Sequence, residues 1–199
     1  MGMFGCFTVD LSARSADRLS TFQLLKRFIF NPGYRVLVYY RFAMALRRMS
    51  FPRRTSSVFA SLILVRLARV PGVEFQCSEE IGAGLLMCHP HDIVIGAGSR
   101  IGRRVTIYNS VTLGARVTKA IDASAGDDER YPVIEDDVTI FPGARIIGFV
   151  TIGKNSIVAA NAVVTKSFPP NSVIGGIPAK LIGTRDGEGP SNSIDDGSL

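Results

Sequence analysis

The sequence predicts a mainly β protein: a left-handed parallel β-helix built from a six-residue repeat, with an α-helical cap at its amino-terminal end. Two observations predict this fold class. From residue 95 onward, aliphatic residues recur at every sixth position, and this period fits neither the helical period of about 3.6 residues nor the two-residue alternation of a strand. Residues 18–73, in contrast, contain eleven Lys and Arg residues and no Asp or Glu. The chain therefore joins a basic segment to a repetitive one.

The size and composition of the chain limit what it can be. It has 199 residues, of which 46% are hydrophobic and 20% are charged, so we expect one globular domain with a small accessory piece rather than a disordered chain. Three scattered cysteines without a CxxC spacing indicate a reducing, cytoplasmic setting. The two histidines are too few for a three-histidine metal centre, and we expect no metal. We also expect neither a secretory signal nor a membrane-spanning helix.

The basic segment has the apolar spacing of amphipathic helices, interrupted by turn motifs at Pro32 and Pro52. We predict two or three helices, over residues 20–30, 34–49 and 56–69. These helices either cap the β-helix with their arginines in solvent, or bring the protein into peripheral contact with an anionic membrane through residues 18–73. No nucleic-acid-binding motif accompanies the charge, so we expect no nucleic-acid partner.

The six-residue repeat is the strongest feature of the sequence. Ten positions at one phase are all aliphatic, which chance would produce about once in a million trials. They are Ile95, Ile101, Ile107, Leu113, Ile134, Ile140, Ile146, Ile152, Val158 and Val164. A chain with this period must turn a corner every six residues, so three faces form a coil of about 18 residues. The inward aliphatics stack from coil to coil, and we expect the basic helices to cap one end and residues 174–182 the other.

The repeat breaks at two places, where function is expected. At the first, Met87 and Ile95 are eight residues apart instead of six, around Cys88-His89-Pro90-His91-Asp92. At the second, Leu113 and Ile134 are 21 residues apart, so a polar loop over 115–133 leaves the β-helix. We therefore divide the chain into four segments: a tail 1–17, a basic helical segment 18–72, a β-helix domain 73–183 and a flexible tail 184–199.

Both histidines of the chain lie at the first break. Three roles compete for His89 and His91. A metal site would need further ligands from elsewhere, and a structural role would have the imidazoles hydrogen-bond nearby backbone. The third role is a general base, because imidazole titrates near neutral pH and suits the deprotonation of a hydroxyl. A Cys88–His89 nucleophile is disfavoured, because neighbours in a strand face opposite ways.

Several motifs between residues 71 and 183 occur together. They are Pro71-Gly72-Val73-Glu74-Phe75, Ile81-Gly82-Ala83-Gly84, His89, Ile93-Val94-Ile95-Gly96, Ser110-Val111-Thr112-Leu113-Gly114, Arg130-Tyr131-Pro132, Ile146-Ile147-Gly148 and Gly175-Gly176-Ile177-Pro178-Ala179-Lys180. This set resembles the serine acetyltransferase family of hexapeptide acyltransferases. The resemblance implies acetyl transfer from acetyl-CoA, with His89 as general base and Glu74 in place of the carboxylate, usually Asp, that pairs with it. A thioester is already activated, so the reaction needs only a base within reach of the acceptor hydroxyl.

Two departures from the family bear on the acceptor. Cys88 stands where the family has an Asp before the catalytic His, and Tyr131 stands where it has a His after the loop arginine. Those family residues help to hold the amino-acid substrate, so we expect a different acceptor: a sugar hydroxyl of a capsule or exopolysaccharide, or of its glycan or glycolipid precursor. L-serine in cysteine biosynthesis is the alternative, and a non-catalytic scaffold is the third hypothesis.

The resemblance also implies a trimer that binds CoA in the groove between neighbouring β-helices. The residues expected to bind the acceptor are His91, Asp92, Arg130 and Tyr131. Those expected to contact CoA are Gly114, Ala115, Gly143, Ala160 and Lys180. A backbone amide near Gly114 or Ala115 would stabilise the oxyanion. We expect a cytoplasmic enzyme, with the inner membrane face as a second location if the basic helices bind lipid.

Overall fold

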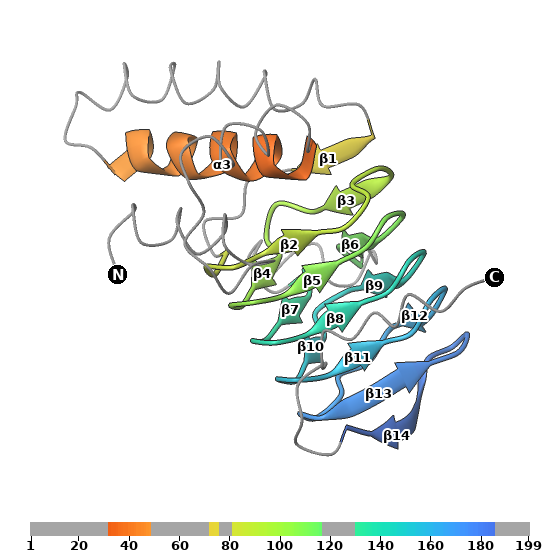
Figure 1. The fold of residues 1–199 in the computed structure, drawn as a ribbon. Helices are drawn as coiled ribbons and strands as arrows, with labels where there is room; N and C mark the ends of the chain where they lie inside the picture. Colours follow the sequence, from red (N-terminus) through yellow and green to blue (C-terminus); the bar gives the residue numbers. More distant parts are fainter. Residues whose placement is uncertain (1–31, 49–71, 76–80, 117–129, 186–199) are drawn as a thin grey trace, which may run out of the picture.

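The computed structural model describes residues 32–48, 72–75, 81–116 and 130–185. These residues form one helix, α3 (Pro32–Arg48), and fourteen short strands that wind into a three-sided coil (Figure 1). Three sheets make the sides, and all their strand pairs are parallel except β13–β14. Sheet 1 contains β1 (Val73–Phe75), β3 (Ile93–Ile95), β6 (Thr112–Gly114), β9 (Arg145–Ile147) and β12 (Val163–Val164). Sheet 2 contains β4 (Arg100–Ile101), β7 (Val133–Ile134) and β10 (Thr151–Ile152).

Sheet 3 faces the remaining side. It contains β2 (Leu86–Met87), β5 (Thr106–Ile107), β8 (Thr139–Ile140), β11 (Ile157–Val158), β13 (Ser172–Gly175) and β14 (Lys180–Thr184). The chain passes from sheet 3 to sheet 1 to sheet 2 and returns to sheet 3 one coil further along. We call the three edges of this prism corner 3–1, corner 1–2 and corner 2–3, after the sheets that each one joins.

The predicted stack of aliphatic residues is confirmed. All ten repeat positions are at most 3% exposed. The parallel register places Ile107 beside Ile140, and Ile140 beside Val158, so each position meets its equivalent in the next coil. Such contacts bury apolar surface without a break along the axis, which is the main stabilising term of the fold.

A second buried row lies two residues before each repeat position. It contains Ser99, Val105, Val138 and Ser156, each 0% exposed. Side chains two residues apart point to the same side of a strand, so both rows face the interior. Of the two serines, Ser156 bonds locally: its hydroxyl donates to Pro169 O (3.3 Å) and accepts from Ser172 N (3.0 Å), whereas the buried Ser99 hydroxyl has no hydrogen-bond partner among the described residues.

Corner 2–3 requires a left-handed backbone residue in each coil. Arg104, Asp137, Asn155 and Asn171 occupy these positions, with φ between 53° and 61°. Asn and Asp are enriched in this conformation. Their side chains also pair between coils: Arg104 donates to Asp137 (Nε to Oδ1 2.5 Å and a terminal nitrogen to Oδ2 2.7 Å), and Asn155 donates to Asn171 at 2.8 Å. At this corner Gly153 has no room for a side chain, because a Cβ would collide with the Pro169 and Pro170 backbone.

Helix α3 lies across the first coil, next to β2 (Figure 1). It begins at Pro32, whose fixed φ suits the first helical position, and it buries Tyr34, Leu37 and Tyr40. The Arg41 guanidinium donates to Ile81 O (2.6 Å) and Gly82 O (2.5 Å), so the helix is hydrogen-bonded to the start of the first coil. The helix predicted over 34–49 is confirmed. Those predicted over 20–30 and 56–69 lie outside the described residues.

At the other end, β14 pairs antiparallel with β13 and stops the parallel stacking, as expected for the region 174–182. Among the described residues, no helix has the length and apolar character required to cross a membrane. The boundaries of the four predicted segments stay predictions.

The central stack supports a first prediction. Ile140 is 0% exposed and is flanked by Ile107 and Val158, so Ile140→Ala leaves a cavity and lowers the free energy of unfolding by about 2–5 kcal/mol. Ile157 precedes Val158 on the outer side of β11 and is partly exposed, so Ile157→Ala is the matched control, with a loss of about 1 kcal/mol. Urea unfolding followed by circular dichroism at one protein concentration measures both. Equal losses in the two variants would contradict the stacked core.

Candidate functional site

The first break in the repeat is a bulge at corner 3–1. Val94 pairs with Thr112, so Val111 is the equivalent of Ile93. Three residues, 108–110, separate Ile107 from Val111 in the second coil, but five residues, 88–92, separate Met87 from Ile93 in the first. The backbone ladder holds on both sides of the bulge, because Cys88 N donates to Ile107 O (2.8 Å) and Ser110 N donates to His91 O (2.9 Å). The extra residues are therefore pushed outward without disturbing the coil.

His89 lies at the start of this bulge with a left-handed backbone, φ 50°. Its carbonyl accepts from His91 N at 2.8 Å, which closes a tight turn. The side chain of His89 is exposed rather than packed in the core. This position leaves the imidazole available to a ligand, so the geometry favours a base over a buried structural histidine.

Glu74 lies in β1, the strand next to the bulge. β1 pairs with β3 in the register Glu74 beside Val94, and Ile93 N donates to Gly72 O at 3.0 Å. Gly72 touches the bulge itself: a Cβ there would lie 3.2 Å from Asp92 N and 3.3 Å from the His91 Cα. Glu74 is exposed. The structure thus places Glu74 in the strand stacked on β3, next to the bulge that carries His89, and the pairing of their side chains stays a prediction.

His91 and Asp92 form a loose pair at the same bulge. The distance between His91 Nδ1 and Asp92 Oδ2 is 4.0 Å, and the side chains are 61% and 78% exposed. A pair this open contributes little to stability. Both side chains are accessible to solvent, and their role in binding an acceptor stays a prediction. Within the described residues, no group of three His, Cys, Asp or Glu side chains is arranged to hold a metal ion.

The other two predicted acceptor residues lie at a different corner. Arg130 and Tyr131 close the base of the long loop at corner 1–2, where Arg116 N donates to Arg130 O at 3.3 Å. The Tyr131 ring covers Gly96, where a Cβ would collide with it. The width of sheet 1 separates corner 1–2 from corner 3–1, so one chain does not bring these residues together with His91 and Asp92. Residues 117–129 of the loop lie outside the described residues.

The residues predicted to contact CoA are divided in the same way. Gly114 ends β6 and Ala115 follows it at corner 1–2. Gly143, with φ 75°, and Ala160 lie at corner 3–1. A side chain at Gly143 would be strained by this left-handed backbone and would displace the Asn161 amide. Lys180 begins β14 and is exposed. Both edges of sheet 1 therefore carry parts of the predicted site.

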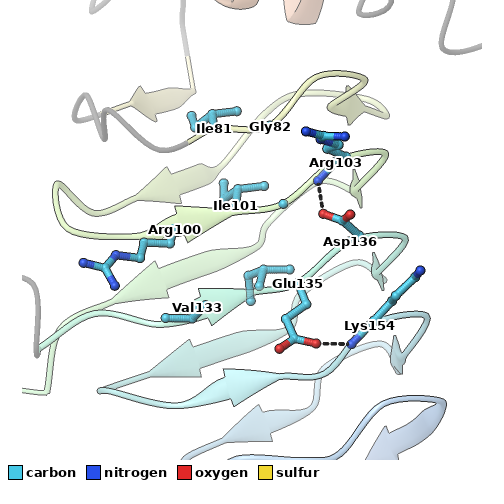
Figure 2. Close-up of a pocket in the computed structure, with 11 residues that line it drawn as sticks. Ile81, Gly82, Arg100, Ile101, Arg103, Val133, Glu135, Asp136 and Lys154 are labelled. Carbon is cyan, nitrogen blue, oxygen red and sulfur yellow. Dashed lines mark hydrogen bonds between the residues drawn. The ribbon is translucent and has the colours of Figure 1, made fainter. Parts of the chain in front are cut away.

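A shallow, open pocket of about 590 Å³ lies elsewhere, at corner 2–3 (Figure 2). Charged side chains surround it: Arg100, Arg103, Glu135, Asp136 and Lys154. The two carboxylates are engaged by turn amides, because Asp136 accepts from Arg103 N and Glu135 accepts from Lys154 N, both at 2.7 Å. The pocket contains none of the predicted site residues. Sequence reasoning missed it because Arg103 and Asp136 are 33 residues apart, and no local motif joins them.

The resolved pKa shifts also occur at corner 2–3. The hydrogen bonds from Arg104 hold the pKa of Asp137 below its ordinary value, and the charges of Arg104, Lys154 and Arg185 act in the same direction. The same hydrogen bond raises the pKa of Arg104. These shifts describe a structural ion pair on the side of the coil away from the histidines.

Comparison with known proteins identifies relatives of the chain. Residues 131–166 match the family model described as bacterial transferase hexapeptide (six repeats). A serine acetyltransferase of Helicobacter pylori strain J99 is 35% identical over 159 residues, which cover 79% of this chain and 85% of that protein.

Solved structures give the same result. The serine acetyltransferase of Neisseria gonorrhoeae superposes with a TM-score of 0.73 at 24% identity, over 99% of this chain and 70% of that one. Soybean serine acetyltransferase complexed with serine gives a TM-score of 0.69 at 30% identity, over 90% of this chain and 69% of that one. The likeness establishes the coil as a left-handed β-helix.

The expected sugar acceptor is contradicted by these relatives. The Helicobacter and soybean proteins are named for serine, and none of the relatives above is named for a capsule, glycan or membrane. The expectation rested on Cys88 and Tyr131, which replace two residues of the family pattern, and on the short helical segment and the longer loop of this chain. The structure places the two residues at two different corners, Cys88 at corner 3–1 after β2 and Tyr131 at corner 1–2 before β7.

The ion pair at corner 2–3 supports a second prediction. Because the Asp137 pKa is lowered on folding, the pair stabilises the protein fully above the ordinary carboxyl pKa of about 4, and this contribution is lost as the pH falls through the lowered value. The side chains of Arg104 and Asp137 are 58% and 27% exposed, so solvent screening limits the loss in Asp137→Asn to about 0.5–1 kcal/mol at pH 7. Asn tolerates the left-handed backbone.

Unfolding curves at pH 7 and at pH 3 check this second prediction, and the difference between wild type and Asp137→Asn shrinks at the lower pH. Asp136→Asn is the matched control, because an amide oxygen still accepts from Arg103 N. A difference that stays constant with pH would show that the charge pair contributes nothing.

Proposed function

Since the chain belongs to the serine acetyltransferase family, we propose that it transfers the acetyl group of acetyl-CoA to the hydroxyl of L-serine. The observation that carries this proposal is the exposed His89 in the bulge at corner 3–1, in a chain 35% identical over 159 residues to a serine acetyltransferase. The scattered cysteines fit a reducing, cytoplasmic setting. Membrane contact through residues 18–73 falls mostly on residues outside the described ranges.

The reaction requires one base and a stabilised oxyanion. His89 accepts the hydroxyl proton of serine as the serine oxygen attacks the thioester carbonyl, which forms the new C–O bond. The tetrahedral intermediate then expels the CoA thiolate, which takes the proton from the imidazolium. Glu74, in the adjoining strand, stabilises this imidazolium and orients the ring. A backbone amide near Gly114 or Ala115 donates to the oxyanion.

We further propose that the enzyme is a homotrimer. Corner 3–1 carries His89, whereas corner 1–2 carries Arg130 and the long loop, and sheet 1 lies between them. Around a three-fold axis, corner 3–1 of one copy meets corner 1–2 of the next, which unites the two halves of the site. Arg130 of the neighbouring copy then lies where it can bind the serine carboxylate or a CoA phosphate.

The acceptor is tested by measuring free CoA thiol. The purified protein is incubated with acetyl-CoA and, in parallel, with L-serine, simple sugars or capsule-type oligosaccharides. We expect serine alone to drive thiol release. L-homoserine and L-alanine are matched controls, one with a displaced hydroxyl and one without any. Absence of release with serine would overturn the proposed function, and absence with every acceptor would favour a scaffold.

The base is tested by His89→Ala. We expect kcat to fall by about 100- to 10,000-fold, as for loss of a general base, with an unchanged assembly mass by light scattering and an unchanged unfolding midpoint. His91→Ala removes the second imidazole of the bulge and serves as a matched comparison; it raises the KM for serine while kcat stays within about threefold. Near-normal turnover of His89→Ala would remove His89 from the mechanism.

A further inference from the structure

Two aromatic rings stack at corner 3–1, below the bulge. The ring centroids of Tyr108 and Phe141 are 5.2 Å apart and the ring planes are inclined by 6°. Neither residue belongs to the site described above. Tyr108 directly follows the inward Ile107 of β5, and Phe141 directly follows the inward Ile140 of β8.

The backbone ladder fixes the position of this pair relative to His89. Cys88 N donates to Ile107 O at 2.8 Å, and Tyr108 N donates to Ile140 O at 3.0 Å. Cys88, Tyr108 and Phe141 therefore hold the same position in three successive coils, seen as the loops after β2, β5 and β8 in Figure 1. His89 follows Cys88, so the rings begin one coil, about 5 Å, from the bulge and extend to about 10 Å.

The side chains become small below the pair. Phe141 N donates to Val158 O and Ala159 N donates to Ile174 O, so Ala159 and Gly175 continue the same row. Beside them lie Gly143 and Ala160. Phe141 is 37% exposed, so its ring presents apolar surface to solvent next to a stretch of small residues. An aromatic ring left exposed beside a catalytic group is a common feature of ligand sites.

We infer that the Tyr108–Phe141 pair is the apolar wall along which the pantetheine arm of the acyl donor lies, and that it sets the affinity for acetyl-CoA. This inference rests on the proposed function. The pair carries no charge, whereas serine is a small zwitterion whose recognition needs charged partners such as Arg130. The rings also extend over two coils away from the base, which suits a long, thin chain and exceeds the size of serine.

The end of the coil supports this orientation. Val163 N donates to Gly176 O (3.1 Å) and Ala179 N donates to Val163 O (2.8 Å), so the turn before Lys180 lies alongside the last strand of sheet 1. The order along the axis is therefore base, aromatic pair, small residues and an exposed lysine. If the thioester of the donor lies at His89, its pantetheine arm contacts the apolar Tyr108–Phe141 pair. The phosphates of the donor then lie near the positive charge of Lys180.

The test separates donor affinity from chemistry and from folding. We expect Phe141→Ala to raise the KM for acetyl-CoA about tenfold, with kcat and the KM for serine within twofold of wild type. The Kd for CoA, measured by calorimetry, increases by the same factor. Phe141→Leu keeps an apolar side chain and recovers part of the affinity. The matched control is Phe42→Ala in α3, an exposed ring (52%) that is not part of corner 3–1, and its constants stay at wild-type values.

Each outcome decides one question. An active wild type whose KM for acetyl-CoA is unchanged in Phe141→Ala overturns the inference and leaves the proposed function standing. A rise in the KM for serine instead assigns the pair to the acceptor, and loss of assembly in both Phe141 variants assigns it to a subunit contact; both overturn the inference. If Phe141→Ala does not fold, Phe141→Leu and Tyr108→Leu decide by the same constants. A wild type without CoA binding or turnover contradicts the proposed function itself.

Discussion

The whole structure depends on one constraint: the aliphatic residue at each sixth position must lie on its equivalent in the next coil. Ile107, Ile140 and Val158 show this stacking in sheet 3. Because every coil has to return to the same register, an insertion within a strand would displace the entire stack. Extra residues are therefore accommodated at the corners, where the backbone already leaves the sheet. The bulge around His89 and the long loop after Ala115 are the two places where this happens.

The three corners differ in how far they depart from the regular turn. Corner 2–3 is regular, and its left-handed Arg104, Asp137, Asn155 and Asn171 pair between coils. Its carboxylates satisfy turn amides, so the mixed-charge pocket of Figure 2 is a consequence of how this corner is built. Corner 3–1 carries the bulge with the exposed His89, His91 and Asp92. Corner 1–2 carries the loop. The proposed chemistry therefore lies where the repeat is least regular, on both edges of sheet 1.

The sequence alone predicts the periodic part of this structure well. Each inward aliphatic position, both breaks and the helix over 34–49 follow from spacing and turn chemistry, which are local properties. The second buried row was not predicted, because Ser99 and Ser156 are polar and their burial depends on coil stacking. The pocket at corner 2–3 was not predicted either, since its charges meet only through the fold. The predicted sugar acceptor was wrong, because Cys88, Tyr131 and the differences in segment length are local departures in a chain that is 35% identical to a serine acetyltransferase over 159 residues.

The coil spacing of about 4.8 Å also bears on how one corner could serve both substrates of the proposed reaction. In that proposal the acceptor binds at the first coil, where the bulge presents His89, His91 and Asp92. With His89 as the proposed base, the donor thioester has to reach the same bulge, and the rest of the donor then lies along the later coils. Each later coil contributes one residue to that path, and Tyr108 and Phe141 are the residues of the second and third. Changes at these positions can therefore alter donor affinity while the base and the acceptor contacts stay in place.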